Sequence, residues 1–413
     1  MRAGLIFVML GMAQPGAAQS LNTSESDSPV ERVEMTAVGT EQGFADWLTG
    51  FRPRALEAGI APGVLESALA VARYNPKIIE RDRNQNEFSK TIWDYLDTAV
   101  SDDRVAHGKR ALAQHGAILA QIEAEYGVDR HVIAAIWGLE SAYGSFRGDI
   151  PTIEALATLA YDARRAAFFE AELIAALKII GNGDVSAQAM RGSWAGAMGH
   201  TQFMPTSWWA HAVDHDGDGR RDVWADDPTD ALASAAAYLR HWGWTSGALW
   251  GLEVRLPEGF DYDQTTERVK KPVADWAAMG VVPVTGGAAL PDHGLASVLL
   301  PGGARGAAFL IFSNFQVIER YNTADAYVIA VGHLADRLRG GPAIQATWPR
   351  ELRALSLAER KELQERLGAA GFDPKGVDGR IGPNTIAAVK AFQRANGRVP
   401  DGYASVEVLQ ALR

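Results

Sequence analysis

The stretch Ala134–Gly144, AAIWGLESAYG, places one charged side chain, Glu140, among Ala, Ile, Trp, Leu and Tyr. Residues three, four and seven apart share one face of a helix, so Glu140 projects beside Ile133, Ile136 and Trp137, on the stripe expected to pack inward. A carboxylate removed from water must be paired, hydrogen-bonded or protonated, and desolvation raises its pKa. The stretch therefore predicts a helix that carries an acid on its packed face.

Two interpretations of Glu140 follow. No Lys or Arg lies within one helical turn of it, and the nearest in sequence is Arg147. In the first interpretation a distant Arg pairs with the carboxylate, or the stripe is more exposed than the pattern indicates. In the second, burial raises the pKa of the acid so that it can donate a proton near neutral pH. The rest of the chain must decide between them.

The composition is that of an ordinary globular protein. The chain has 413 residues, 47% of them hydrophobic and 22% charged, which is enough for two or three domains. Its net charge of -10, without a cluster of Lys and Arg, argues against a nucleic-acid partner. It contains no cysteine, which excludes disulfides and a lipid anchor on an N-terminal cysteine.

The N-terminal segment, MRAGLIFVMLGMAQPGAAQS, has the pattern of an export signal. One Arg precedes an apolar run that is too short to span a bilayer, and small residues follow. We expect a signal peptide over residues 1–18, a flexible polar leader over 19–41, and a periplasmic protein that is not a lipoprotein. No other apolar run is long enough to span a membrane, so we expect no integral membrane segment after cleavage.

Helical periodicity dominates residues 42–338. Short apolar runs broken by Gly and Pro between Leu252 and Phe315 predict a few strands within this region. Two glycines and two prolines mark residues 339–352 as a linker. The remaining segment, 353–413, is near the small end of independently folding domains. The fold class expected is therefore mainly α, with a small β region and a small C-terminal domain.

The stretch DHDGDGRRDVWADD matches the start of a calcium loop. Alternate carboxylates and a backbone carbonyl can converge on a hard cation there, while Gly219 takes the sharp turn. The twelfth position, where a Glu is usual, is Ala225, but a longer loop could supply the closing carboxylate from Asp226, Asp227 or Asp230. We favour Asp230 and a structural rather than catalytic Ca²⁺. The predicted metal residues are Asp214, Asp216, Asp218, Arg220 and Asp230.

Four segments resemble a known family when taken in order. GLESAYGSFRG, GAMGHTQFMPTSW, the acidic loop and SNFQVIERYN follow one another as in the membrane-bound lytic murein transglycosylase B family, whose core resembles goose-type lysozyme. The resemblance covers roughly Phe44 to Leu338 and implies a lysozyme-like helical catalytic domain. The tail, LQERLGAAGFDPKGVDGRIGPNTIAAVKAFQRANG, resembles the three-helix peptidoglycan-binding domain of cell-wall enzymes. On fold analogy alone, it could also bind another partner.

The resemblance implies a reaction on peptidoglycan strands without an organic cofactor. Glu140 would protonate the oxygen between N-acetylmuramic acid and N-acetylglucosamine, and then take a proton from the muramyl 6-hydroxyl as a 1,6-anhydro ring closes. The saccharide contacts implied by family position are Ser193, Gln202, Asn314, Tyr321 and Tyr327. Two alternatives stay open: a muramidase in which water attacks with help from a second carboxylate, and a calcium-stabilised wall-binding protein without turnover.

Overall fold

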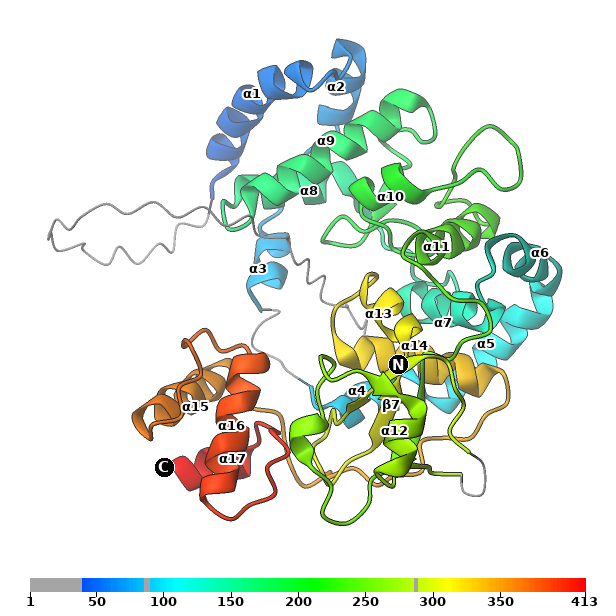
Figure 1. The fold of residues 1–413 in the computed structure, drawn as a ribbon. Helices are drawn as coiled ribbons and strands as arrows, with labels where there is room; N and C mark the ends of the chain where they lie inside the picture. The colour runs from blue at the N-terminus through cyan, green and yellow to red at the C-terminus, as the bar shows by residue number, and fades with distance from the viewer. Residues whose placement is uncertain (1–38, 85–89, 286–288) are drawn as a thin grey trace, which may run out of the picture.

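The computed structural model describes residues 39–84, 90–285 and 289–413 (Figure 1). The predicted signal peptide and residues 19–38 of the predicted leader lie outside these described residues. Where the description begins, the side chain of Thr40 accepts a hydrogen bond from the N–H of Gly43 and so caps the first helix. Nowhere in the described part of the chain is a helix both long and apolar enough to cross a bilayer.

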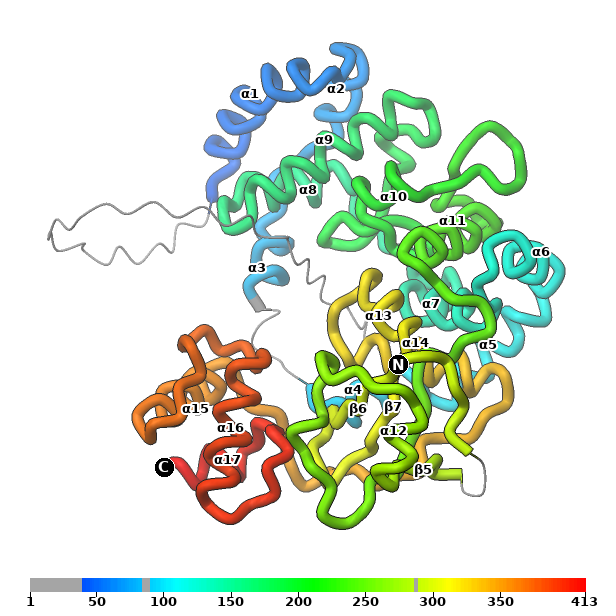
Figure 2. Tube along the Cα trace, viewed as in Figure 1, coloured from blue at the N-terminus to red at the C-terminus, as the bar shows by residue number. Residues whose placement is uncertain are grey.

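Helices are the main elements of the chain before the C-terminal domain, as the amphipathic periodicity predicts. They are α1 (Glu41–Glu57), α2 (Pro62–Leu69), α3 (Pro76–Asn84), α4 (Ile92–Ala99), α5 (Asp102–Gln114), α6 (Gly116–Tyr126), α7 (Arg130–Ser141), α8 (Thr152–Tyr161), α9 (Ala166–Asn182), α10 (Pro205–His211), α11 (Thr229–His241), α13 (Ser313–Glu319) and α14 (Asp325–Leu338). The tube in Figure 2 shows α8 and α9 side by side, with α1 and α2 packed on them. One hydrophobic cluster contains buried side chains from all of these helices.

Helix α7 lies in the middle of this core. Its N-terminus is capped by Asp129, whose carboxylate accepts a hydrogen bond from the N–H of His131 over 2.7 Å. Every residue from Val132 to Leu139 is buried. Because α7 packs against α5, α6, α11 and α14, helices from both halves of the helical region fix the position of its last turn.

A small antiparallel sheet follows α11 in the chain. Its five strands run in the order β4-β6-β7-β3-β5, and they are β3 (Gly251–Arg255), β4 (Lys271–Pro272), β5 (Val282–Pro283), β6 (Leu295–Leu299) and β7 (Ala308–Ile311). One face packs with α12 (Val273–Ala278) around the buried side chains of Trp276, Val298 and Phe312. Two further short strands, β1 (Ile150–Pro151) and β2 (Arg191–Gly192), pair elsewhere. The mainly helical class with a small β region is confirmed.

Three helices make up the C-terminal domain: α15 (Leu357–Ala369), α16 (Pro383–Ala395) and α17 (Val406–Leu412). They enclose a separate core that contains Leu363, Val389 and Leu409. The buried amide of Gln364 donates to the carbonyl of Arg380 and accepts from the N–H of Gly379, which ties the glycine turn to α15.

The segment 339–352, predicted as a linker, lies against the preceding structure. The carboxylate of Glu253 accepts hydrogen bonds from the N–H groups of Gln345 and Ala346, the latter over 2.7 Å. The ring of Trp348 lies 6.0 Å from that of Trp93. These contacts place the C-terminal domain beside the sheet rather than at the end of a free chain (Figure 1).

Hydrogen bonds also join the C-terminal domain to the sheet region directly. The ammonium group of Lys390, on α16, donates to the carbonyl of Tyr262 over 2.5 Å and to the hydroxyl of Thr265 over 3.1 Å. On the next loop, the carboxylate of Asp401 accepts from the N–H of Ala304 over 2.9 Å. A buried cation with two oxygen partners fixes this pose more firmly than exposed ion pairs would.

Candidate active site

Glu140 lies in the last turn of α7. Its Oε1 accepts a hydrogen bond from the hydroxyl of Tyr327, on α14, over 2.6 Å. Burial raises the pKa of Glu140 to about 7, and the bond from Tyr327 offsets part of that rise. Among the described residues, no Lys or Arg forms a salt bridge with it. Pairing with an Arg is therefore wrong for this structure, whereas Glu140 is half-buried, so the end of the stripe is more exposed than the pattern indicates.

Three tyrosines surround the carboxyl group. Tyr95, on α4, and Tyr321, between α13 and α14, both interact electrostatically with Glu140, and Tyr327 bonds to it. The Tyr321 hydroxyl donates to the carbonyl of Thr201 over 2.6 Å, and its ring stacks on that of Tyr327 with 6.5 Å between centroids. Burial raises the pKa of each tyrosine, so the hydroxyls stay neutral. The pocket is thus polar but uncharged.

Sequence reasoning did not find Tyr95. Its hydroxyl is buried without a hydrogen-bond partner in the described residues. An unpaired buried hydroxyl carries a cost, and this one lies beside the Glu140 carboxyl group. In the sequence, TIWDYLDTA shows only a helix in which Tyr95 is one aromatic residue among others, so no local signal distinguishes it.

The backbone immediately after Glu140 takes an uncommon course. Ala142, Tyr143 and Gly144 have φ angles of 49°, 58° and 84°. Two consecutive non-glycine residues in the left-handed region are costly and persist only where the surroundings hold them. The Ser141 hydroxyl holds this turn by donating to the carbonyl of His200 over 2.6 Å and accepting from the N–H of Gly144 over 3.0 Å. A strained loop therefore follows the last turn of α7, and hydrogen bonds of Ser141 hold it in place.

The Tyr143 side chain packs closely against the backbone of α5 and α7. Its hydroxyl donates to the carbonyl of Arg104 over 3.2 Å. A Cβ added at Gly138 would lie 2.5 Å from the Tyr143 ring, and one at Gly108 would lie 2.2 Å from its hydroxyl. Both glycines are therefore required because the ring passes close to the backbone.

Ser193 and Gln202 lie on the loop that joins β2 to α10, next to the turn after α7. The Ser193 hydroxyl accepts from the N–H groups of Ala195 and Ala197, which leaves its own hydrogen to be donated. Gln202 has a φ of 52°, and its amide nitrogen donates to the carbonyl of Arg147 over 3.1 Å, which leaves its side-chain oxygen as a free acceptor. Both residues keep hydrogen-bonding capacity suited to sugar hydroxyls.

Asn314 does not join this cluster. It is fully buried on α13, and its amide bonds entirely to the loop before β3. Its oxygen accepts from the N–H of Thr245 over 2.9 Å, while its nitrogen donates to the carbonyls of Thr245 and Ala248. A saccharide contact would require these bonds to break.

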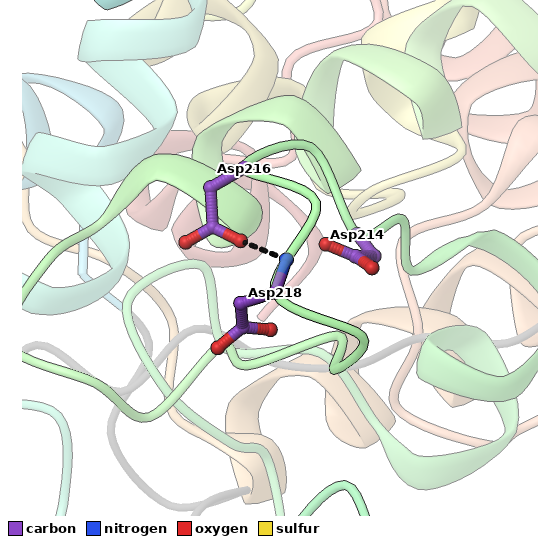
Figure 3. A group of neighbouring side chains, drawn as sticks. All are labelled: Asp214, Asp216 and Asp218. Carbon is purple, nitrogen blue, oxygen red and sulfur yellow. Dashed lines mark hydrogen bonds between the residues drawn. The ribbon is translucent and has the colours of Figure 1, made fainter.

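The acidic loop brings three predicted metal residues together (Figure 3). Oxygens of Asp214, Asp216 and Asp218 all lie within 4.8 Å of one another on the exposed surface. Asp214 accepts from the N–H groups of Gly217 and Gly219 over 2.8 and 2.9 Å, which curls the loop around the carboxylates. Like charges this close repel unless a cation lies between them, and hard oxygens suit Ca²⁺.

Asp230 lies behind this loop rather than among the three carboxylates. It is buried at the start of α11. One of its oxygens accepts from the N–H groups of His215 and Asp216, and the other accepts from Asp222 over 3.0 Å. As placed, Asp230 organises the backbone of the loop. Arg220, whose carbonyl is the predicted main-chain ligand, donates its N–H to Asp218 over 2.8 Å.

The fold and this pocket define a class of protein. Residues 43–336 match the family described as the transglycosylase SLT domain, and residues 356–412 match the putative peptidoglycan-binding domain. The chain belongs to the SLT-domain transglycosylase family, with a peptidoglycan-binding domain at its C-terminal end. The family resemblance drawn from the motifs is confirmed.

Individual relatives agree with this assignment. The chain is 34% identical over 247 residues to membrane-bound lytic murein transglycosylase B of Escherichia coli, which is 58% of this chain and 65% of that protein. SltB3 of Pseudomonas aeruginosa, solved in complex with NAG-NAM-pentapeptide, is 48% identical with a TM-score of 0.88, over 90% of this chain and all of that one. Escherichia coli Slt35, solved in complex with calcium, is 28% identical with a TM-score of 0.61, over 73% and 94%.

Proposed function

We propose that the protein is a lytic transglycosylase of peptidoglycan. It cleaves the β-1,4 bond between N-acetylmuramic acid and N-acetylglucosamine and leaves a 1,6-anhydro-N-acetylmuramic acid end. The observation that carries this proposal is the isolation of Glu140: a carboxyl with a pKa of about 7, bonded to a tyrosine hydroxyl and not to a cation. Such a group is half protonated near neutral pH and can act first as an acid and then as a base.

The two oxygens of Glu140 have different roles in this proposal. Oε1 accepts from Tyr327, so the proton to be transferred resides on Oε2. That proton passes to the glycosidic oxygen while the N-acetyl carbonyl oxygen of the muramyl residue attacks its own C1, and the bond to the leaving sugar breaks. Glu140 then removes the proton of the muramyl 6-hydroxyl, and O6 displaces the N-acetyl oxygen from C1. Glu140 is protonated again, and no water is consumed.

The hydrolytic alternative requires a second carboxylate. Glycosidases that use two acids hold them about 5 to 9.5 Å apart across the scissile bond. Within the described residues, no other carboxylate perturbs the pKa of Glu140, whereas Tyr95, Tyr321 and Tyr327 are its ionisable neighbours. A pocket lined by neutral hydroxyls favours the single-acid route, in which the substrate supplies the nucleophile. SltB3 has also been solved in complex with NAG-anhNAM-pentapeptide, which supports the anhydro product here.

The remaining assignments follow from the same site. Ser193, Gln202, Tyr321 and Tyr327 contact the saccharide, whereas Asn314 acts indirectly by holding residues 245–248. Asp214, Asp216 and Asp218 hold a structural Ca²⁺ that completes the acidic loop. The C-terminal domain binds the glycan or its peptides in the periplasm, to which the N-terminal signal directs the chain. These roles make Ca²⁺ the one cofactor and peptidoglycan the partner.

Glu140→Gln tests the central assignment. The amide keeps the shape and can still accept from Tyr327, but it has no transferable proton. General acid-base assistance is worth about 10²- to 10⁴-fold, and a residue that serves twice belongs at the upper end. We expect purified murein treated with the variant to yield no 1,6-anhydromuropeptides by mass spectrometry, while its melting temperature stays at or above that of the wild type.

Three results would contradict the proposal. A folded Glu140→Gln variant that releases anhydro products at the wild-type rate would remove Glu140 from the chemistry. Hydrolysed reducing ends instead of anhydro ends, from the wild-type protein, would support the muramidase. Absence of any product on a murein zymogram would favour the wall-binding protein without turnover.

A further inference from the structure

His200 touches the last turn of α7 on both sides of Glu140. Its ring nitrogen Nδ1 accepts a hydrogen bond from the indole N–H of Trp137 over 3.1 Å, and its backbone carbonyl accepts from the hydroxyl of Ser141 over 2.6 Å. Trp137 precedes Glu140 by one helical turn and Ser141 follows it directly. One residue therefore bonds to the helix one turn before Glu140 and directly after it.

The hydrogen-bond partners define the tautomer of the His200 ring. The Trp137 indole can only donate, so Nδ1 must be an acceptor and the ring hydrogen must lie on Nε2. Nε2 lies 2.8 Å from the carbonyl of Ala225, which accepts that hydrogen. The Arg147 guanidinium lies 3.3 Å from the same nitrogen and disfavours a charged ring. His200 is thus a neutral, oriented bridge between α7 and residues 224–226.

Residues 224–226, on the other side of His200, are also held by hydrogen bonds. The Arg147 guanidinium donates to the carbonyls of Trp224 and Ala225 over 2.9 and 2.5 Å and pairs with the carboxylate of Asp226 over 2.7 Å. Because Arg147 follows the strained turn after α7, the same segment is held from both ends. A Cβ at Gly144 would lie 2.6 Å from the His200 ring, so the ring also fills the space beside that turn.

From this arrangement we propose that His200 is a positioning residue for Glu140. Its ring holds Trp137 and its carbonyl holds Ser141, so the half-buried carboxyl group stays in place against Tyr327. The role rests on the proposed function, because it is defined by the proton transfer that Glu140 performs. His200 touches neither the substrate nor the reacting atoms. It acts through the helix, where a misplacement of about 1 Å can cost about 10²-fold in rate.

Two conservative variants separate the two ends of the bridge. In His200→Asn the side-chain oxygen takes the place of Nδ1 and can accept from Trp137, but it does not reach Ala225. In His200→Gln the amide nitrogen takes the place of Nε2 and can donate to Ala225, but Trp137 loses its acceptor. His200→Phe fills the space and makes neither bond. His107→Asn, at an exposed position on α5, is the matched control.

We expect kcat for anhydro-product release to fall about 10- to 100-fold in His200→Gln and His200→Phe, with KM unchanged, and to stay within about three-fold of wild type in His200→Asn. In the impaired variants, a more exposed Glu140 has a pKa closer to the ordinary value, so the alkaline limb of the kcat profile moves to lower pH. Melting temperatures and near-ultraviolet circular dichroism, read on the same samples, show that each variant is folded.

The alternatives give different results. Equal kcat in all folded His200 variants would overturn the inference, as would equal losses in His200→Asn and His200→Gln with an unmoved alkaline limb, which indicates a general packing role. The wild-type protein and Glu140→Gln are measured alongside. If wild type forms no anhydro product, the proposed function fails; if wild type is active and Glu140→Gln is not, the result for His200 stands on its own.

Discussion

At the scale of single residues, the chemistry of Glu140 depends on the absence of a cationic partner among the described residues. A cation would lower its pKa and leave it ionised at neutral pH, whereas the pocket presents the neutral hydroxyls of Tyr95, Tyr321 and Tyr327. Desolvation then dominates, and the one hydrogen bond from Tyr327 keeps the rise in pKa moderate. The position of the pKa near 7 is the balance of these two effects.

Tyr327→Phe should shift that balance in a known direction. The hydroxyl stabilises the ionised carboxylate, so its removal raises the pKa of Glu140 above about 7. A hydrogen bond to a charged group is worth about 1.5 to 3 kcal/mol, or about one to two pH units. Since the acid form of Glu140 starts the reaction, activity is lost as the pH rises through its pKa. The alkaline limb of the kcat/KM profile should therefore move to higher pH.

The matched control for this prediction is Tyr161→Phe. The Tyr161 hydroxyl bonds to the backbone of Thr40, before α1, and not to Glu140. Its removal should leave the pH profile in place. A Tyr327→Phe profile that moves to lower pH would mean that the hydroxyl stabilises the protonated carboxyl instead.

At the scale of elements, the acidic loop and the turn between α13 and α14 both gather carboxylates, but with different surroundings. Asp214, Asp216 and Asp218 are exposed, and the backbone curls so that their oxygens lie within 4.8 Å of one another. Glu267, Glu319 and Asp325 also lie within 4.8 Å of one another, but they are partly buried where the sheet region meets α13 and α14. The first group suits a cation, and the second retains protons.

Calcium should stabilise the native state through the exposed loop. A ligand that binds only the folded protein adds about 2.7 kcal/mol at 100 times its dissociation constant. We expect a chelator to lower the melting temperature, Ca²⁺ to restore it, and Asp216→Ala to abolish the response. Asp46→Ala, an exposed acid on α1, should respond like the wild type. Identical melting curves with chelator and with Ca²⁺ would refute the metal site.

Glu319→Gln tests the partly buried group. Burial first, and then repulsion from Glu267 and Asp325, raise the pKa of Glu319 to about 8. Its pKa in the unfolded chain is about 4.3. The contribution of Glu319 to stability is fully present below that value. It is lost as the pH rises toward 8, because in this range the folded state still holds the proton and the unfolded chain does not. The variant, which is never ionised, should gain in melting temperature relative to wild type at pH 8 and show little gain at pH 5.

A constant difference in melting temperature across this range would contradict the assignment. Glu258→Gln, at an exposed position outside this cluster, serves as the control for loss of one carboxylate. The comparison is made at fixed Ca²⁺ so that the exposed loop does not contribute.

The elements also show what sequence can and cannot reveal. The periodicity around Glu140 predicts α7 because helix spacing and the Asp129 cap are local properties. The partners of Glu140 depend on tertiary packing: Tyr95 arrives on α4 and Tyr327 on α14, and neither helix pattern marks its tyrosine as special. Asn314 shows the converse, since its family position implies a sugar contact but its amide is used entirely by the loop at Thr245.

At the scale of the whole molecule, composition identified a small tail domain but not its fixed pose. Two glycines and two prolines are typical of a linker, yet residues 339–352 lie along the sheet region (Figure 1). Several separate contacts hold this segment in place. Glu253 accepts from two backbone N–H groups, and Trp348 packs on Trp93 and close to Gly302 and Gly306. Such contacts join segments that are far apart in sequence, so no local pattern predicts them.

This packing determines where the C-terminal domain can be removed. A chain that ends at Gly340 loses Trp348 from its place beside Trp93 and leaves the Glu253 carboxylate without its backbone donors. A chain that ends at Leu352 keeps both. Deleting a large buried aromatic typically costs about 3 to 5 kcal/mol, and Trp348 is only partly buried, so we expect the shorter chain to melt several degrees lower than the longer one.

Both truncated chains lack α15, α16 and α17, so both should sediment less with insoluble sacculi than the full-length protein, because a tethered binding domain raises the local concentration of enzyme on its polymer. The chain that ends at Leu352 should still cleave soluble glycan, since Glu140 and its tyrosines lie wholly within residues 43–336. Equal melting temperatures would show that residues 341–352 do not support the helical region. Equal sedimentation of all three proteins would show that the C-terminal domain adds no affinity for the wall, and its fixed position beside the sheet would then be structural.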